Sequence, residues 1–161
     1  MATASKSPSA QSQLLIRRPA AKIYAAFVEP RMLAKFWLKK ASGPLALGKT
    51  VTWHFPVDGI SDKVTATLLE PGRRIVVRWS DGTETEWTFE AVTRTQTMVS
   101  VSQTVKGSAR QRVEAAINGT EGYTLVLADL KVLLERKIRS GIVKDKGVLI
   151  MRAMRSKKKT R

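Results

Sequence analysis

Apolar residues recur at every second position along most of residues 50–105. This period of two is typical of a β-sheet with one covered and one solvated face, because successive side chains of a strand point to opposite sides. Five runs share the pattern, so we predict an antiparallel sheet. Its covered face is expected to carry Val51, Trp53 and Phe55; Val64, Ala66 and Leu68; Ile75, Val77 and Trp79; Thr85, Trp87 and Phe89; and Val99, Val101, Gln103 and Val105.

The segment 80–82, with the sequence Ser-Asp-Gly, connects two of these strands and sets their register. A two-residue loop would place Trp79 opposite Glu84 and so force an apolar and an acidic side chain onto one face. A three-residue loop places Arg78 opposite Glu84 and keeps both faces consistent. We therefore predict the three-residue loop, with Gly82 at positive φ, where glycine costs least.

The segment before the sheet predicts one strand and two short helices. Residues 13–18 form the strand, and Pro19 suits a helix start because its missing N–H costs nothing there. Pro30 separates the helices, and a Gly- and Pro-containing loop at 41–49 follows them. The buried stripes consist of Ile23, Ala26 and Phe27 in the first helix and of Leu33, Phe36 and Trp37 in the second.

A helical period returns late in the chain and predicts a long helix over residues 119–137. We expect Asn118 to be its N-cap, with Glu121 completing a capping box. The same Asn-Gly-Thr also matches a glycosylation sequon, but capping is favoured because no secretory signal precedes it. Gly119 and Gly122 weaken the first turn, which suggests a close approach or open space beneath the helix. The apolar stripe is Tyr123, Val126, Leu127, Leu130, Leu133 and Leu134.

The composition indicates one soluble domain. A length of 161 residues fits a single domain, and 43% hydrophobic residues can form a sizeable core. The absence of cysteine excludes disulfides, thiolate zinc sites and cysteine nucleophiles. Since neither a secretory signal nor an apolar stretch of membrane-spanning length occurs, we expect a cytoplasmic protein.

The formal charge of +16 is concentrated at the C-terminal end. Residues 1–135 contain 18 Lys and Arg against 12 Asp and Glu, whereas residues 136–161 contain 11 against 1. This weakens the case that the domain itself binds nucleic acid. A solvated, disordered tail is favoured, and weak contact with anionic lipid or nucleic acid is the alternative. Leu125 and Val132, opposite the apolar stripe, are either scattered exposed residues or contacts with a second copy or with segment 148–151.

Candidate catalytic chemistry is sparse. His54 is the only histidine, which excludes a multi-histidine metal site, and the alternation places it on the solvated face. No phosphate-binding glycine-rich loop is present. We therefore expect no catalytic residue, no metal and no cofactor, and an enzyme is less favoured than a binding protein. An acidic row on the solvated face is expected to pair across strands: Glu84, Glu86 and Glu90 with Arg74 and Arg78.

Four phrases in this order resemble the SRPBCC (START-like) superfamily: "RRPAAKIYAAFVEPRMLAKFWL", "LGKTVTWHF", "LEPGRRIVVRWSDGTETEWTFE" and "NGTEGYTLVLADLKVLLE". Within it, they resemble the bacterial branch related to the activator of the ninety-kilodalton heat-shock chaperone ATPase. The resemblance covers about residues 13–136 and implies an α+β helix-grip fold. In that fold a curved antiparallel sheet wraps around a long C-terminal helix, and two short helices follow the first strand. We expect a disordered N-terminus at 1–12, the domain at 13–137 and a basic extension at 138–161.

The resemblance also implies a cavity between the sheet and the last helix. We expect non-enzymatic binding of a small, mainly hydrophobic molecule there; the alternative is a co-chaperone-like protein-binding domain, and a homodimer is a further alternative. Whether the aromatic residues line a pocket or fill the core stays open. Gln103 and Tyr123 are of interest because a polar group on an apolar face needs a hydrogen-bond partner. The candidate ligand-binding residues are Phe36, Trp37, Trp53, Phe55, Trp79, Trp87, Phe89, Val101, Gln103, Tyr123, Leu127 and Leu130.

Overall fold

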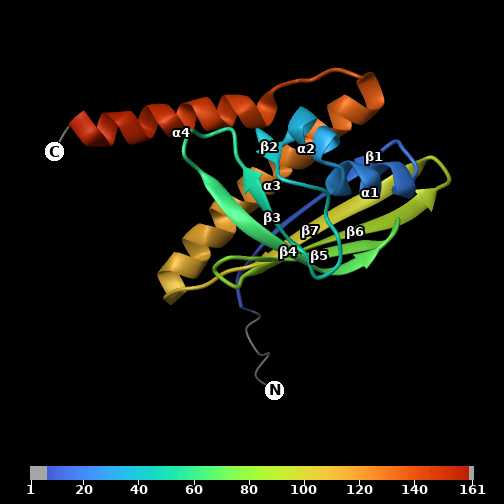
Figure 1. Cartoon of the computed structure of the whole chain (residues 1–161), viewed down its shortest axis with the longest axis horizontal. Helices are drawn as coiled ribbons and strands as arrows, with labels where there is room; N and C mark the ends of the chain where they lie inside the picture. Colours follow the sequence, from blue (N-terminus) through green and yellow to red (C-terminus); the bar gives the residue numbers. More distant parts are fainter. Residues whose placement is uncertain (1–6, 160–161) are drawn as a thin grey trace.

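The computed structural model describes residues 7–159 and shows an α+β fold built on one seven-stranded sheet (Figure 1). All neighbouring strands are antiparallel, in the order β1-β7-β6-β5-β4-β3-β2. The elements are β1 (Ser9–Ile16), α1 (Ala20–Val28), α2 (Pro30–Phe36), β2 (Lys40–Ala41), β3 (Thr50–His54), β4 (Ser61–Glu70), β5 (Arg74–Trp79), β6 (Glu84–Thr93), β7 (Gln96–Thr104), α3 (Ala109–Arg136) and α4 (Ile142–Lys159).

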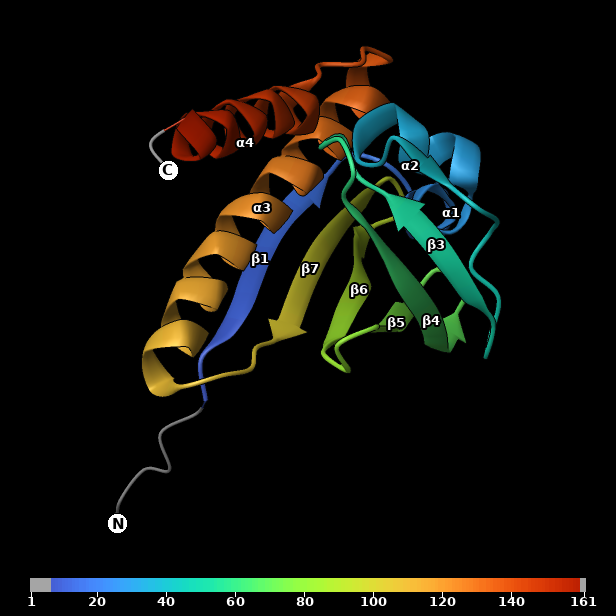
Figure 2. The same ribbon diagram turned by 60° about the vertical axis from the view of Figure 1, so that its left-hand side comes forward.

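The sheet curves around the long helix α3, which confirms the helix-grip expectation. Figure 2 shows α3 running beside β1 and β7, with β3 and β4 on the opposite side of the concave face. The two short helices α1 and α2 cover one end of that face. Helix α4 crosses above α3 and packs against it.

The register at the β5–β6 turn is the predicted one. Arg78 lies opposite Glu84, and the Trp79 amide donates to the carbonyl of Thr83 at 2.9 Å, so the loop contains three residues. Gly82 has a φ of 81°. Two of the three outward-facing acidic side chains pair across strands as expected, in Arg78–Glu84 at 3.1 Å and Arg74–Glu86 at 2.5 Å. Glu90 forms no ion pair with another described residue, so that part of the expectation was wrong.

One strand departs from the predicted alternation. A β-bulge shifts the register of β4 against β5 between Ala66 and Leu68. An extra residue in one strand moves every later side chain to the other face. Leu69, opposite Ile75, therefore packs against the core, and our placement of Leu68 beside Ala66 was wrong.

Helix α3 begins about ten residues earlier than predicted. Its N-cap is Ser108, whose Oγ accepts from the Gln111 amide at 3.3 Å, while Gln111 Oε1 accepts from the Ser108 amide at 2.8 Å. Asn118 and Glu121 lie inside the helix, so the predicted capping box at these residues was wrong. The first turns lack a buried stripe, and for that reason periodicity did not reveal them.

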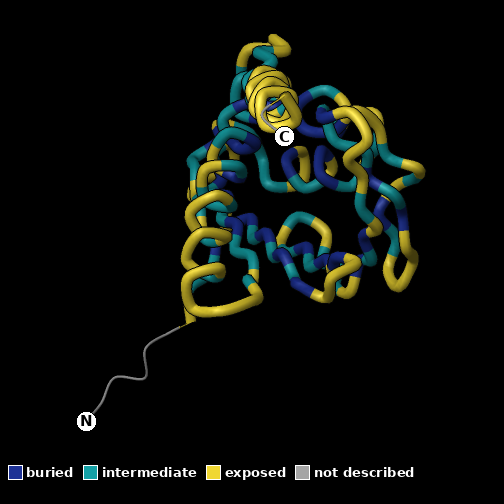
Figure 3. The backbone as a smooth tube through the Cα atoms, turned by 90° about the vertical axis from the view of Figure 1, so that its left-hand side faces the viewer, coloured by how far each residue is buried: buried dark blue, intermediate teal, exposed yellow. Residues whose placement is uncertain are grey.

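Both chain ends are more ordered than expected where the structure describes them. Residues 9–12 belong to β1 and pair with β7; residues 1–6 of the expected disordered segment lie outside the described residues. The expected disordered tail was also wrong, because residues 142–159 form α4. Its start is fixed by Asp129, which is 2% exposed and accepts from Ser140 Oγ at 2.6 Å and from the Val143 amide at 3.1 Å. Most of α4 is nevertheless exposed (Figure 3).

Helix α3 is tied to β1 by the half-buried pair Lys131 and Glu135. Glu135 Oε1 accepts from Lys131 Nζ at 2.6 Å and from the Arg17 amide at 2.7 Å, and Lys131 Nζ also donates to the Leu15 carbonyl at 2.6 Å. Burial alone would raise the pKa of Glu135, but the hydrogen bonds from Lys131 and the Arg17 amide hold the pKa below its ordinary value of 4.5.

Glu135→Gln is expected to lower the free energy of unfolding by about 1 kcal/mol at neutral pH, because a charge-assisted acceptor is lost. Since the folded-state pKa is lowered, this contribution is present above the unfolded-state pKa and disappears as the pH falls through the lower folded value. Urea unfolding of the wild type and of Glu135→Gln across the acid range measures this difference in the free energy of unfolding. A difference that stays constant down to the most acid pH would contradict the assignment.

Candidate functional site

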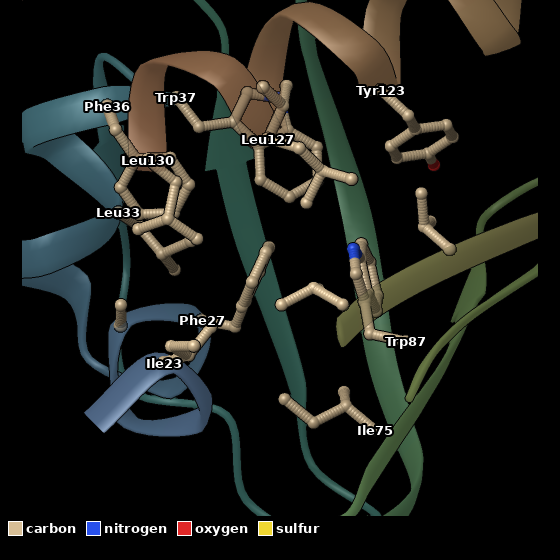
Figure 4. Packing of buried hydrophobic residues seen from close by; sticks show 14 of the residues in the cluster. Ile23, Phe27, Leu33, Phe36, Trp37, Ile75, Trp87, Tyr123, Leu127 and Leu130 are labelled. Atoms are coloured by element: carbon tan, nitrogen blue, oxygen red, sulfur yellow. The ribbon is translucent and has the colours of Figure 1, made fainter. Parts of the chain in front are cut away.

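One part of the space between the sheet and the helices is filled, and Figure 4 shows how. Phe27 of α1 lies 5.4 Å from Trp87 of β6 between ring centroids, and Leu127 and Leu130 of α3 pack above them. All four side chains are almost fully buried. This end of the space, beneath α1 and α2, is a solid core.

The other end of the space is open and forms a pocket of about 640 Å³. Most of its walls come from the β3–β4 loop, the β5–β6 turn, the middle of α3 and the underside of α4, and Trp37 after α2 and Gln103 of β7 complete them. The lining residues are Trp37, Phe55, Pro56, Val57, Ile60, Ser61, Asp62, Trp79, Asp81, Thr83, Gln103, Gly119, Gly122, Tyr123, Leu125, Val126, Val143, Lys146, Gly147, Ile150 and Met154.

A chain of polar side chains lies at the inner end of this pocket. The Trp79 indole N–H donates to Thr85 Oγ1 at 2.8 Å, and Thr85 Oγ1 lies 2.9 Å from the Tyr123 hydroxyl oxygen. Thr85 is fully buried, and Tyr123 reaches the pocket. Burial raises the pKa of the Tyr123 phenol well above its ordinary value, which outweighs the opposite effect of the Thr85 hydrogen bond. The phenol therefore stays protonated through the neutral range.

Aromatic rings form the wall opposite α3. The rings of Phe55 and Trp79 are stacked with centroids 6.2 Å apart, and Trp37 contacts Phe55 and Tyr123 at 6.5 and 6.1 Å. Offset and edge-to-face contacts of this kind hold the rings in place without filling the pocket. The wall can therefore accept a flat apolar molecule.

The pocket rim carries charges that are already engaged. Asp81 Oδ1 accepts from the amide and the hydroxyl of Thr83 at 2.8 and 2.7 Å. Burial alone would raise the pKa of Asp81, but the Thr83 hydrogen bonds and nearby Lys106 hold it below its ordinary value. Lys146 of α4 pairs with Glu121 of α3 at 2.8 Å. The rim charges thus fix the turn and the helix pair.

Helix α4 is the outer wall, and a glycine allows its close approach. A Cβ at Gly147 would lie 2.6 Å from the Pro56 carbonyl oxygen, a distance at which one segment must move. The contact joins α4 to the β3–β4 loop across the pocket mouth. Leu125 of α3, for which a contact with the tail was one alternative and scattered exposure another, lines the pocket together with Ile150 of α4.

The twelve candidate residues fall into three groups. Trp37, Phe55, Trp79, Gln103 and Tyr123 line the pocket. Phe36 lines a neighbouring hollow beside α4. The others pack in the core: Trp53, Trp87, Phe89, Val101, Leu127 and Leu130.

Two kinds of site residue were missed by the sequence reasoning. Thr85 lies on the covered face in the alternation, and its hydroxyl there was a signal that could have singled it out beside Gln103. For α4, the sequence offered contact between Leu125 and segment 148–151, which contains Ile150, only as one of several alternatives. Val143 had no signal, because nothing local shows which surface a terminal helix covers. The tertiary structure alone brings Val143 and Ile150 to the pocket.

The described residues offer little for metal chemistry. Within residues 7–159, no group of three or more His, Cys, Asp or Glu side chains could hold a metal ion. His54 is half-buried on β3 and does not line the pocket.

No helix in the described part of the chain is long and apolar enough to cross a membrane.

Comparison with solved structures supports the fold. A protein of Staphylococcus saprophyticus aligns with a TM-score of 0.71 at 22% identity, over 81% of this chain and 94% of its own. The Aha1 dimer of Colwellia psychrerythraea aligns with a TM-score of 0.69 at 22% identity, over 79% and 96%. The di-domain ARO/CYC BexL from a biosynthetic pathway aligns with a TM-score of 0.70 at 14% identity, over 79% and 46%. Identities this low establish the fold alone.

Comparison with sequence families is more specific. No protein with a curated description matches the chain. The family model described as "Activator of Hsp90 ATPase homolog 1-like protein" matches residues 17–135, which is most of the chain and agrees with the SRPBCC resemblance. The chain therefore belongs to the Activator of Hsp90 ATPase homolog 1-like family.

Proposed function

We propose that this protein binds a small, mainly apolar molecule, without converting it, in the pocket between the sheet, α3 and α4. The observation that carries the proposal is the pocket itself: about 640 Å³ with predominantly apolar walls and a few placed polar groups. Ligand sites commonly have this volume and this composition. The candidate residues that line it are Trp37, Phe55, Trp79, Gln103 and Tyr123.

The walls supply affinity and the polar groups supply orientation. A ligand that removes apolar surface of the aromatic wall from water gains about 25 cal/mol for each Å² buried. Orientation comes from Tyr123 and Gln103, which face the same pocket from α3 and β7. The six candidates in the core act indirectly, because they hold α3 and β6 in place.

The experiment is an amide NMR titration with pooled fatty acids, sterols, flavonoids and polyketide-like aromatics. Saturable shifts at the five lining residues are expected. Gly122→Leu is the blocking variant, because Gly122 lines the pocket and a Cβ there meets no atom within 4 Å. It should abolish the shifts, whereas Ala115→Leu, on the exposed side of α3, should leave them unchanged. Shifts that persist in Gly122→Leu would contradict binding in this pocket.

Family membership favours a second candidate, a co-chaperone-like protein-binding role. The family description names an activator of the Hsp90 ATPase, and such a role needs a surface rather than a pocket. Stimulation of a purified Hsp90-type ATPase measures it directly. Stimulation that is equal in the wild type and in Gly122→Leu, with no ligand shifts, would favour this role over ligand binding.

A further inference from the structure

The Thr85–Tyr123 pair has one more hydroxyl hydrogen than it has acceptors among the described residues. Each hydroxyl carries one hydrogen, and the single hydrogen bond between them uses one of the two. The Trp79 indole already donates to Thr85 Oγ1. Among the described residues, Thr85 has no side-chain hydrogen-bond partner besides Trp79 and Tyr123, and Tyr123 has none besides Thr85. One hydroxyl hydrogen therefore has no acceptor within this part of the chain.

Burial decides which residue carries the spare hydrogen. Thr85 is 0% exposed, and a buried hydroxyl hydrogen without an acceptor costs about 1–3 kcal/mol. Tyr123 lines the pocket, so its hydrogen can point into the open space. The stable arrangement has Trp79 donating to Thr85, Thr85 donating to Tyr123, and Tyr123 left as a free donor at the pocket.

We propose that the pocket selects apolar ligands that carry a hydrogen-bond acceptor, such as a carbonyl oxygen, placed against the Tyr123 hydroxyl. This inference rests on the proposed function, since it names the ligand class of the same pocket. The side chain of Gln103 makes no hydrogen bond within the described residues, and its amide can bind a second polar group of either kind.

A matched pair of probe molecules measures the contribution of the Tyr123 hydroxyl donor to ligand binding. Flavanone and flavan share one skeleton, and only flavanone has the carbonyl oxygen. Their dissociation constants are measured by quenching of tryptophan fluorescence. We expect flavanone to bind roughly three- to tenfold more tightly than flavan to the wild type. In Tyr123→Phe the ratio should fall to about one, with flavan affinity retained. Tyr24→Phe removes the chain's only other phenol, which does not line the pocket, and should keep the ratio.

The outcomes separate this inference from the proposed function. Equal affinities of the two probes for the wild type, or a ratio unchanged in Tyr123→Phe, would contradict the role of the Tyr123 hydroxyl as hydrogen-bond donor to the ligand. Either result would leave the proposed binding in the pocket unaffected. Binding of neither probe would overturn both. Because the ratio is taken within one variant, a general loss of stability does not affect it.

A second inference concerns the solvent side of α4. We define the basic ridge as Lys144, Arg152, Arg155 and Lys159, whose spacings of eight, three and four place them on one side of the helix. All four are exposed, and none forms an ion pair with another described residue. Two exposed apolar side chains, Val148 and Leu149, lie among and beside them, whereas Ile150 and Met154 face the pocket.

We infer that the basic ridge binds the surface of an anionic lipid membrane. Cationic side chains interspersed with exposed apolar ones are the composition of helices that lie in a lipid interface. Nucleic acid fits less well, because residues 137–161 contain no aromatic side chain on which a base could stack. Since α4 also forms the outer wall of the pocket, this contact would bring the pocket close to the lipid.

Sedimentation with phosphatidylcholine vesicles, with and without phosphatidylglycerol, tests this inference on the full chain. Binding is expected only with phosphatidylglycerol and should weaken as salt is added. The double variant Arg152→Glu/Arg155→Glu should bind at least about tenfold more weakly. Lys49→Glu/Arg94→Glu, on exposed loops of the body, makes the same change of net charge and should have a much smaller effect.

Three results would overturn the inference: no binding to phosphatidylglycerol vesicles, equal losses in both double variants, or binding to a single-stranded oligonucleotide that is tighter than binding to the vesicles. The second would show that net charge alone matters. The third would assign the ridge to nucleic acid instead.

Discussion

Deletion of residues 138–161 is expected to weaken binding of flavan roughly thirtyfold. The sequence alone favoured a solvated, disordered tail in this segment. The structure makes α4 the outer wall, with Val143, Ile150 and Met154 among the lining residues. Loss of a wall that buries part of an apolar ligand costs about 2 kcal/mol at ~25 cal/mol per Å². Fluorescence titration of the full-length and the truncated protein with flavan gives the ratio of their dissociation constants.

A full-length variant controls for the loss of positive charge. Gly147→Leu places a side chain where a Cβ alone would already lie 2.6 Å from the Pro56 carbonyl oxygen, so α4 must move away from the β3–β4 loop. It keeps every charge of the tail and should weaken flavan binding to a similar degree. Unchanged flavan affinity in both variants would show that α4 is not a functional wall.

Gly119→Ala is expected to lower the free energy of unfolding by about 1–3 kcal/mol, although alanine is the better helix former. A Cβ at Gly119 would lie 2.6 Å from the Cβ of Ala10 in β1, and neither atom can turn away. The two segments are also joined by hydrogen bonds, with Thr120 accepting from the Gln11 amide at 3.1 Å and Thr124 paired with Ser12 at 2.8 Å. The new methyl group must therefore push α3 from β1. Urea unfolding measures the change.

Gly122→Ala is the matched control, three residues along the same helix. A Cβ at Gly122 meets no atom within 4 Å, so the substitution should stabilise the protein by about 0.5–1 kcal/mol through helix propensity. The test is whether the two substitutions change the free energy of unfolding in opposite directions. If Gly119→Ala stabilised the protein as much as Gly122→Ala, the close approach of α3 to β1 would not limit packing.

The strand faces could be predicted because alternation is a local property. Trp87 and Phe89 point inward for the same reason that Glu86 points outward, and no distant contact is needed to say so. The one strand in which this failed contains the bulge before Leu68, which inserts a residue without changing local composition. The turn at 80–82 was predictable because only one loop length keeps like residues on like faces.

The candidate site was predictable only in part. Alternation placed Trp79 and Trp87 on the same face, yet one lines the pocket and the other is buried beneath α1. The difference depends on where Phe27 of α1 lies over the sheet, which is a contact between segments 60 residues apart in the chain.

The sequence by itself determined most of the secondary structure of residues 13–104, the inward face of the sheet up to the bulge in β4, and the apolar stripe of α3. Each follows from the spacing of neighbouring residues, whereas the short strand β2 was not predicted. The tertiary structure decided where α3 begins, because its first turns touch no core, and where α4 lies, because that depends on Asp129 and Pro56 in distant segments. Local spacing carries no information about such partners. The open pocket exists because α4 and the β3–β4 loop meet across the end of the sheet that α1 and α2 leave uncovered.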